Sequence, residues 1–360
     1  MFLKKTITFQ GFFLFVCLLT IMVGKAGAAE YWLQVGAAEM TMADGSKVPV
    51  WGFGLDQDSN FTTAGDHAVS VPGPALRVGA DDKVLIIHLK NNLSEPVSLN
   101  ILGQNLTNNS GPVWTNFPND TETWSGARPA GNYTARVRSF THETLPGQVG
   151  EYRWESFRSG TYMLQSATNP AKQVQMGMFL PVVKDVGQKL AYTDVPYDSE
   201  VVVVFHEIDP TIQNAIAAGT YGAVPGATIG SSVDREAKYF LMNGMSYPDE
   251  GLQHINGKVA LYEGKRLLIR FINAGLDTHV PQLQGLYMTL WAEDGTRYQY
   301  PKEAYGFSLP TGKTVDAILV SPKEPPWHYP LYDARMNLNN NGVYPGGMFS
   351  YIRSSVPDHR

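Results

Sequence analysis

Residues 71–103 read VPGPALRVGADDKVLIIHLKNNLSEPVSLNILG, a turn rich in glycine and proline followed by a continuous run of β-type residues. That run, Val84 to Lys90, is closed by an Asn-Asn pair, and a short apolar segment between turn residues indicates a buried β-strand. Three further runs of this kind are Val201 to Phe205, Arg266 to Asn273 and Ala317 to Ser321. Such strands are typical of a sandwich whose two sheets bury their inner faces.

Helical patterning is rare in this chain. Only Pro210 to Ala218 (PTIQNAIAA) predicts a short helix. The 35 glycines and 23 prolines also fit many short strands joined by turns better than long helices. An all-β fold is therefore expected.

Two stretches of the chain follow one pattern, in which a glycine turn precedes a buried strand and an Asn-containing turn. The first is the stretch quoted above, and the second runs from Gly264 to Gly275. This repetition predicts two β-sandwich domains, residues 29–187 and 188–360, with the boundary near Gly187 to Pro196.

The overall composition excludes two broad classes of protein. Hydrophobic residues make up 43% of the 360 residues and charged residues 17%, so the chain can fill a sizeable core and is not disordered as a whole. The net charge is −5, so the chain lacks the excess of basic residues that nucleic-acid-binding proteins have. No nucleic-acid partner is expected.

The first 28 residues have the features of a secretory signal. Lys4 and Lys5 give the positive start, Gly11 to Gly24 form an apolar run, and Ala26-Gly27-Ala28 offers a cleavage site of small residues. The apolar run is shorter than the roughly 20 residues that a spanning helix needs. We therefore predict an exported protein, periplasmic or extracellular. A retained N-terminal anchor is the alternative.

The only cysteine, Cys17, lies inside this signal. A mature chain without cysteine has no disulfide and no thiolate chemistry. Nothing after the signal is apolar enough to span a membrane, so no transmembrane segment is expected after cleavage.

Several motifs resemble those of the multicopper oxidases, the laccase-like family. Besides residues 71–103, these are GTYMLQSATNPAKQVQMGMF (160–179), FLMNGMSYP (240–248), LLIRFINAGLDTHVPQLQGLYMTLWAEDG (267–295) and LPTGKTVDAILV (309–320). The resemblance implies two cupredoxin-like Greek-key β-sandwich domains. It also implies copper, which that family holds with histidines of two hallmark stretches in its first domain.

The hallmark positions carry other residues here. The histidines of the first hallmark, His-x-His-Gly, are replaced by Asn100 and Leu102. In the second hallmark, the first histidine position is Gln165 and the later one is Ala167 or Asn169, depending on the variant compared. Leucine and alanine carry no donor atom, and neutral amide oxygens bind copper poorly. The resemblance thus indicates a degenerate member of the family that lacks the copper ligands.

The electron-accepting copper site of the family needs a cysteine, and the mature chain is expected to have none. The family's third domain, with its His-Cys-His stretch, would lie beyond Arg360 and is expected to be missing. No cofactor is therefore predicted, with copper as the alternative.

The remaining histidines show no His-x-His pair and no i, i+4 spacing. His206 and His279 are the weak metal candidates, and a hydrogen-bonded structural role is favoured for both. A copper-dependent oxidoreductase with rearranged ligands stays an alternative if His206, His254, His279 or His328 converge across a subunit contact. Copper storage or delivery is another, through the methionines Met176, Met178, Met242, Met245, Met336 and Met348, although such residues more often fill core gaps.

A carboxylate pair follows the second of the apolar strands. Glu207 and Asp209 alternate along an extended segment, which places both on one face and would suit acid-base work. Because Pro210 stops the strand, a solvated strand end is the favoured interpretation.

A polar insertion, Thr107 to Gly150, is rich in Asn, Thr and Gly. We expect it to form long loops over one end of the first sandwich. Aromatic residues in polar loops often anchor interfaces, and the predicted contact surface comprises Trp114, Phe117, Trp124 and Tyr133. The alternative is that these rings cover the open end of the sandwich.

These observations favour a non-catalytic binding or assembly role in the cell envelope or outside the cell. The expected partner is an unknown protein or envelope component, and homo-oligomer formation is left open.

Overall fold

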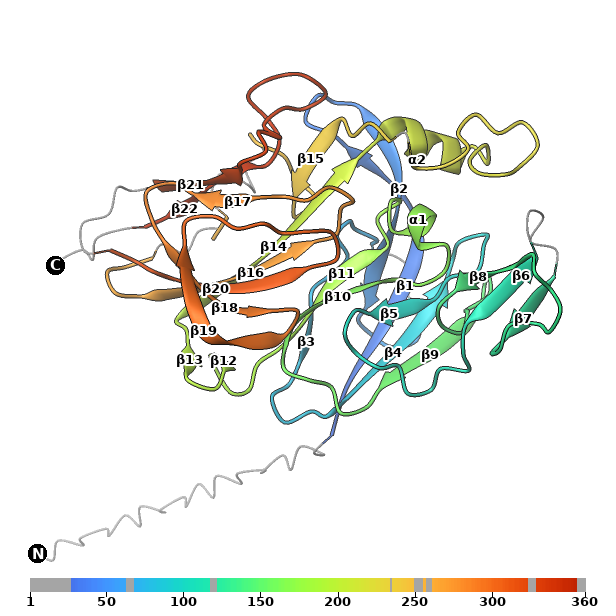
Figure 1. The fold of residues 1–360 in the computed structure, drawn as a ribbon, viewed down its shortest axis with the longest axis horizontal. Helices are drawn as coiled ribbons and strands as arrows, with labels where there is room; N and C mark the ends of the chain where they lie inside the picture. The colour runs from blue at the N-terminus through green and yellow to red at the C-terminus, as the bar shows by residue number, and fades with distance from the viewer. Residues whose placement is uncertain are drawn as a thin grey trace, which may run out of the picture.

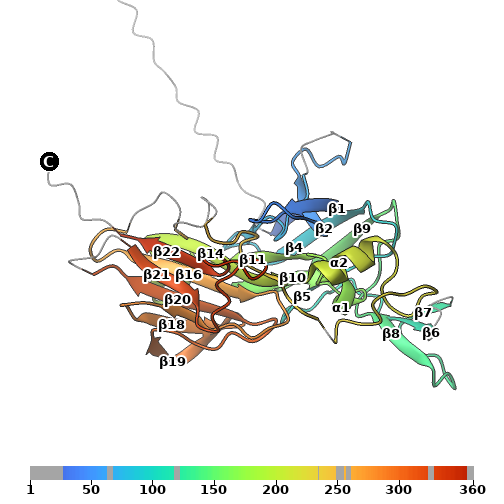
Figure 2. The same cartoon turned by 90° about the horizontal axis from the view of Figure 1, so that it is seen from above.

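A computed structural model describes the chain over residues 27–62, 68–116, 122–233, 235–248, 255–256, 261–322 and 328–354. Figures 1 and 2 show two β-sandwiches side by side, the first built from the earlier part of the chain and the second from the later part. The predicted all-β class with two cupredoxin-like sandwiches is confirmed.

The first sandwich consists of two four-stranded sheets. One sheet has the order β2-β1-β4-β9, with β1 at Ala28–Thr41, β2 at Lys47–Asp56, β4 at Val84–Asn91 and β9 at Val149–Trp154. The other has the order β3-β11-β10-β5, with β3 at Leu76–Val78, β11 at Phe179–Lys184, β10 at Gly160–Ser166 and β5 at Leu99–Ile101. Along β4, every second side chain (Leu85, Ile87 and Leu89) is fully buried in the core between these sheets.

The second sandwich pairs a six-stranded sheet with a three-stranded one. The larger sheet has the order β15-β14-β16-β20-β18-β19, with β15 at Tyr239–Met242, β14 at Ser199–Ile208, β16 at Arg266–Asn273, β20 at Thr314–Val320, β18 at Met288–Glu293 and β19 at Thr296–Ala304. The smaller sheet has the order β17-β21-β22, with β17 at Pro281–Leu283, β21 at His328–Asp333 and β22 at Phe349–Arg353. Phe271 of β16 and Leu331 of β21 meet in the core between them.

The four apolar runs of the sequence all lie in strands, namely β4, β14, β16 and β20. The predicted helix is α2, Pro210–Ala217, and a single further turn, α1, spans Pro170–Gln173. Asp209 begins α2 by accepting a hydrogen bond from the Thr211 amide at 2.9 Å. Within the described ranges, no helix has the length and apolar character to cross a membrane.

A small two-stranded sheet, β12 (Leu190–Tyr192) with β13 (Val195–Pro196), lies in sequence between the strands of the two sandwiches. The domain boundary proposed near Gly187 to Pro196 falls on this segment.

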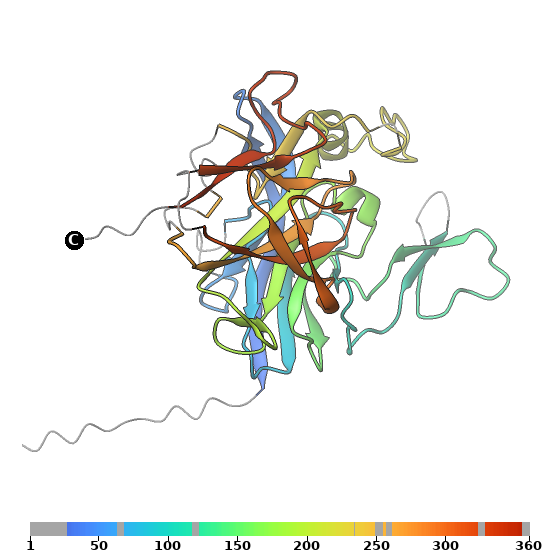
Figure 3. The ribbon, with the colours of Figure 1, turned by 60° about the vertical axis from the view of Figure 1, so that its left-hand side comes forward.

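The insertion differs from the expectation of long loops. Its described residues include three strands, β6 (Val113–Asn116), β7 (Thr123–Ser125) and β8 (Ala135–Ser139), in the order β7-β6-β8. Figure 3 shows this small sheet, in teal, standing out from the side of the first sandwich rather than lying over its end. The β-branched and aromatic residues of VWTN and TWS explain the difference, since they fit a half-buried pleated surface despite the polar composition around them.

Candidate functional site

The hallmark positions Asn100 and Gln165 lie directly opposite each other. Asn100 of β5 is the cross-strand partner of Gln165 of β10, and Leu102 follows β5 with its amide donating to the Met163 carbonyl at 3.1 Å. Their neighbours Leu99, Ile101 and Leu164 point into the sandwich core, so Asn100, Leu102 and Gln165 share the outer face of that sheet.

Part of this outer face packs against the second sandwich through apolar side chains. Leu102 and Met163 belong to one hydrophobic cluster with Val204 of β14 and Ile272 of β16. A pocket of about 110 Å³ lies beside Leu102 and Met163, and neither Asn100 nor Gln165 lines it. Leu102 and Met163 thus fill the junction at this point, and the pocket beside them, which Thr161, Asp294 and Thr314 also line, has room for only a few waters.

The two other hallmark positions also lack a metal-binding environment. Ala167 is fully buried. Asn169 adopts a left-handed conformation (φ 39°) before α1, and its amide donates to the Arg138 carbonyl of β8 at 2.8 Å. Asn169 therefore turns the chain away from β10 toward the insertion.

The residues at these positions do not fit copper. Copper prefers imidazole, thiolate and thioether donors, whereas two neutral amides, a leucine and an alanine take those places here. The described ranges contain no group of three His, Cys, Asp or Glu side chains arranged to hold a metal ion.

The methionines of the copper-carrier alternative are mostly core residues. Met176 and Met178 are fully buried in different hydrophobic clusters, while Met242 and Met348 lie in the core of the second sandwich. This placement agrees with the gap-filling role of methionine.

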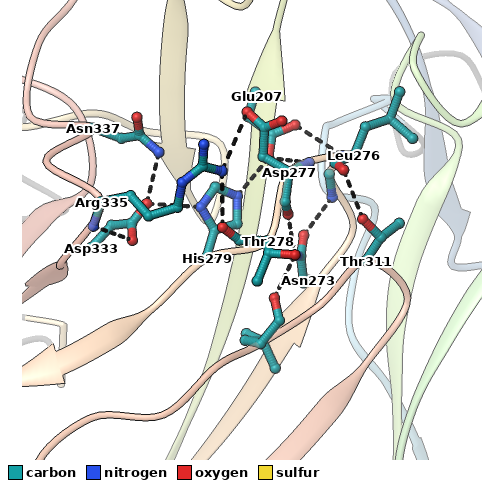
Figure 4. Close-up of polar contacts among 12 residues, drawn as sticks. Glu207, Asn273, Leu276, Asp277, Thr278, His279, Thr311, Asp333, Arg335 and Asn337 are labelled. Atoms are coloured by element: carbon teal, nitrogen blue, oxygen red, sulfur yellow. Dashed lines mark hydrogen bonds and ion pairs between the residues drawn. The ribbon is translucent and has the colours of Figure 1, made fainter.

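His279 lies in a buried cluster of ionic groups (Figure 4). Its Nδ1 lies 2.9 Å from Asp333 Oδ2 and its Nε2 lies 2.5 Å from Glu207 Oε1, and all three side chains are fully buried. Burial opposes the charged ring, but the hydrogen bonds and charges of the two carboxylates outweigh it and raise the pKa of His279 to about 9. An imidazolium that donates from both nitrogens has no lone pair for a metal, which argues against His279 as a ligand.

The Glu207 carboxylate is held by further donors. It accepts hydrogen bonds from the amide of Leu276 at 3.0 Å and from Arg235 Nη1 at 3.4 Å. Gly275 makes the close approach possible, since a Cβ there would lie 2.2 Å from Glu207 Oε1. Arg235 also pairs with Asp277 at 2.7 Å.

The expectation of a solvated strand end at Glu207 and Asp209 is wrong. Both side chains are buried, because Glu207 is neutralised by His279 and Arg235 while Asp209 accepts amide hydrogen bonds from Thr211 and, at 2.8 Å, from Glu236. Arg235 and His279, which neutralise Glu207, lie 28 and 72 residues from it in the sequence. A local sequence pattern therefore could not predict these contacts.

His206, the other weak metal candidate, points to the junction of the two sandwiches. Its ring packs edge-on against Phe179, the cross-strand neighbour of Gln165, with 5.2 Å between centroids. Burial is the main cause that lowers the pKa of His206 to about 4. Nε2 of His206 is buried without a hydrogen-bond partner among the described residues, so the histidine lies in an apolar contact and not in a donor cluster. His254 lies outside the described residues.

A second buried ionic network, which the sequence did not reveal, spans the junction. Arg270 of β16 is fully buried, donates to Thr161 of β10 at 2.9 Å, and pairs with Asp185, Glu200 and Asp316. Thr161 in turn donates to Asp316 at 2.5 Å. The network therefore links strands of the first sandwich to three strands of the second.

The predicted aromatic contact surface lies on the projecting sheet. Trp114 of β6 and Trp124 of β7 are cross-strand partners, both half-buried, and Trp114 Nε1 donates to the Gly126 carbonyl at 2.8 Å. Tyr133 is 89% exposed beneath the Arg128 guanidinium, 5.4 Å from its ring centroid. Phe117 lies outside the described residues.

Comparisons with solved structures identify the architecture. A blue copper oxidase from Nitrosomonas europaea superposes with a TM-score of 0.66 and 16% identity, over 91% of this chain and 86% of that one. The multicopper oxidase mgLAC gives a TM-score of 0.64 with 20% identity, over 91% and 87% of the two chains. The chain has the cupredoxin fold of the multicopper oxidases.

The same fold also occurs in a copper nitrite reductase from Nitrosomonas europaea, with a TM-score of 0.59, 16% identity, and coverage of 91% of this chain and 94% of that one. No family model and no curated protein matches the chain in sequence. At such low sequence identities, the similarity establishes the fold alone. The chemistry of this chain has to be inferred from the residues of its own site.

Proposed function

We propose that this chain is an exported multicopper-oxidase-like protein that retains the cupredoxin scaffold without copper centres and acts by binding or assembly. The observation that carries the proposal is the presence of Asn100, Leu102 and Gln165 on one sheet face in place of the hallmark histidines, with Leu102 packed against apolar side chains of the second sandwich. A catalytic copper centre at this place would need imidazole ligands and access for a substrate.

The proposed contact surface is the projecting sheet β7-β6-β8 with Trp114, Trp124 and Tyr133. Supporting this choice, the sheet stands apart from both sandwiches (Figure 3) and carries large aromatic side chains on a polar segment. Exposed or half-buried Trp and Tyr residues are frequent anchors of protein interfaces. The proposed partner is a protein or another component of the cell envelope.

A photo-crosslinking amino acid at one position tests this role. With the crosslinker in place of Tyr133, illumination of producing cells should give a discrete crosslinked product of the exported protein. The matched control replaces Tyr300, which is 81% exposed on β19, far along the chain from the insertion. Equal products from both positions, or none from Tyr133, would contradict the proposed contact surface.

A further inference from the structure

A cavity of about 670 Å³ opens between the projecting sheet, α1 and the loop that follows α2. Its lining comes from three separate segments: residues 136–140 of β8 and just beyond it, residues 169–172 of α1, and residues 221–225 after α2. Volumes of several hundred Å³ are typical of sites for small organic ligands.

The charge of the lining differs in sign from that of the whole chain. Arg136, Arg138 and Lys172 line the cavity, and no carboxylate occurs among its described lining residues. The chain as a whole has a net charge of −5. A concave surface with this charge favours an anionic group.

The Arg138 side chain is fixed by two hydrogen bonds and keeps one guanidinium nitrogen available as a donor. It donates Nε to Glu143 Oε1 at 3.1 Å and Nη2 to Glu143 Oε2, and the Glu143 side chain is buried. These bonds leave Nη1 of the guanidinium without a hydrogen-bond partner among the described residues. Lys172 also lines the cavity, but its ammonium is held by Glu95 and lies 5.4 Å from the Trp51 ring, two residues that line a neighbouring cavity. Donors whose side chains are already ordered lose little conformational freedom when a ligand binds.

Apolar side chains form another part of the same lining. Phe140 is 54% exposed and Val224 is 41% exposed, and Val137 and Pro225 lie among the lining residues with them. Exposed apolar side chains around a cavity gain free energy when a hydrocarbon or aromatic body covers them. The lining thus combines a fixed cationic donor, Arg138, with an apolar wall.

We propose that this cavity binds a small organic anion that has an acidic head group and an aromatic or aliphatic body. The head group would meet Arg138, and the body would lie against Phe140 and Val224. This inference does not depend on the absence of copper or on the protein contact surface, so each can fail separately.

A titration with 1-anilinonaphthalene-8-sulfonate, an aromatic anion whose fluorescence rises in apolar sites, tests the proposal. We expect saturable binding of one molecule per chain. The neutral counterpart N-phenyl-1-naphthylamine, which lacks the sulfonate, should bind about tenfold more weakly because it cannot use the charged donors. Binding of the neutral compound with equal affinity, or binding that does not saturate, would overturn the proposal.

A pair of variants at one exposed lining residue locates the probe without disturbing the buried ion pairs. Ala223→Glu should raise the Kd of the sulfonate about threefold to fivefold, and Ala223→Lys should lower it by a similar factor, as expected for exposed charges. Phe140→Ala should also weaken binding, whereas Tyr300→Ala on β19 should not. An unchanged Kd in both Ala223 variants would show that the probe binds elsewhere and would refute the site.

Discussion

His279 donates from both ring nitrogens to buried carboxylates, and this single arrangement determines the charge of the whole cluster. The positive charges of His279 and Arg235 offset the negative charges of Glu207 and Asp333. Each of these buried carboxylates in the second sandwich therefore has a positively charged partner. Removing one partner of such a group is far more damaging than its net contribution suggests, because the other partner then remains buried and unpaired.

The raised pKa of His279 predicts loss of stability in alkali. The ring titrates at about 9 in the folded protein and near 6.5 when unfolded. Its stabilisation is therefore fully present below pH 6.5 and is lost as the pH rises through 9, with a total of about 3 kcal/mol. Urea unfolding at a series of pH values between 6 and 10 measures this loss as a fall in the free energy of unfolding. Glu207→Gln should move the loss to lower pH, while Glu30→Gln, at the half-exposed His88 pair, should leave the profile unchanged. A flat profile for the unmodified protein would contradict this assignment.

His206 predicts the opposite behaviour in acid. Burial lowers the pKa of His206 to about 4 in the folded protein. Between pH 6.5 and pH 4, the imidazole is therefore protonated in the unfolded chain but neutral in the folded protein. Stability should fall by about 2 kcal/mol between pH 7 and pH 5 from this residue alone. His206→Phe, which keeps a ring against Phe179, should reduce that fall in urea titrations at the two pH values. If the variant loses as much stability in acid as the unmodified protein, the lowered pKa is not the cause.

At the scale of single elements, local patterns predicted four of the strands, namely β4, β14, β16 and β20. Val84 to Lys90 and Arg266 to Asn273 consist mostly of apolar residues, and the structure places them in β4 and β16. The insertion was harder to predict, because β6 and β7 each contain only a few strand-forming residues between Asn, Gly and Pro. Their pairing depends on contacts between residues 113–116 and 135–139, which no short window of sequence shows.

The projecting sheet predicts a local effect of mutation. Trp114→Ala removes the cross-strand contact with Trp124 and the bond to Gly126, but neither tryptophan belongs to the described hydrophobic clusters. We expect faster hydrogen exchange in residues 111–139 and a melting temperature within a few degrees of the original. The control Trp154→Ala, in the core of the first sandwich, should cost about 3–5 kcal/mol. Equal destabilisation by both variants would show that the sheet is part of the core.

At the scale of the whole molecule, the two sandwiches are joined by apolar packing and by one buried ionic network. Met163 and Leu102 meet Val204 and Ile272 at the junction, and Arg270 reaches from β16 to Thr161 and Asp185. Both features indicate that the sandwiches behave as one rigid unit.

This junction predicts cooperative unfolding. Calorimetry of the unmodified protein should show one transition, and Arg270→Met should destabilise it by about 3–5 kcal/mol by leaving buried carboxylates unpaired. The matched control Arg77→Met removes a half-exposed arginine from Asp185 and Glu200 and should cost about 1 kcal/mol or less. Equal losses in the two variants would contradict a special role for the buried arginine.

The candidate site could be predicted only in part. The hallmark substitutions at Asn100, Leu102 and Gln165 can be found from the resemblance, since each position follows a recognisable motif. The Glu207–His279–Asp333 cluster and the Arg270 network could not, because their interacting members lie between 46 and 155 residues apart and meet only through the tertiary fold.

The central claim is that a cupredoxin scaffold functions here without copper, and metal content tests it most directly. The protein lacking residues 1–28 is loaded separately with Cu(II) and with Cu(I), dialysed, and analysed by mass spectrometry beside its absorption spectrum. The account predicts copper far below one atom per chain after either treatment and no blue absorption. One or more tightly held copper ions per chain would contradict it and would make the scattered histidines and methionines the next residues to mutate.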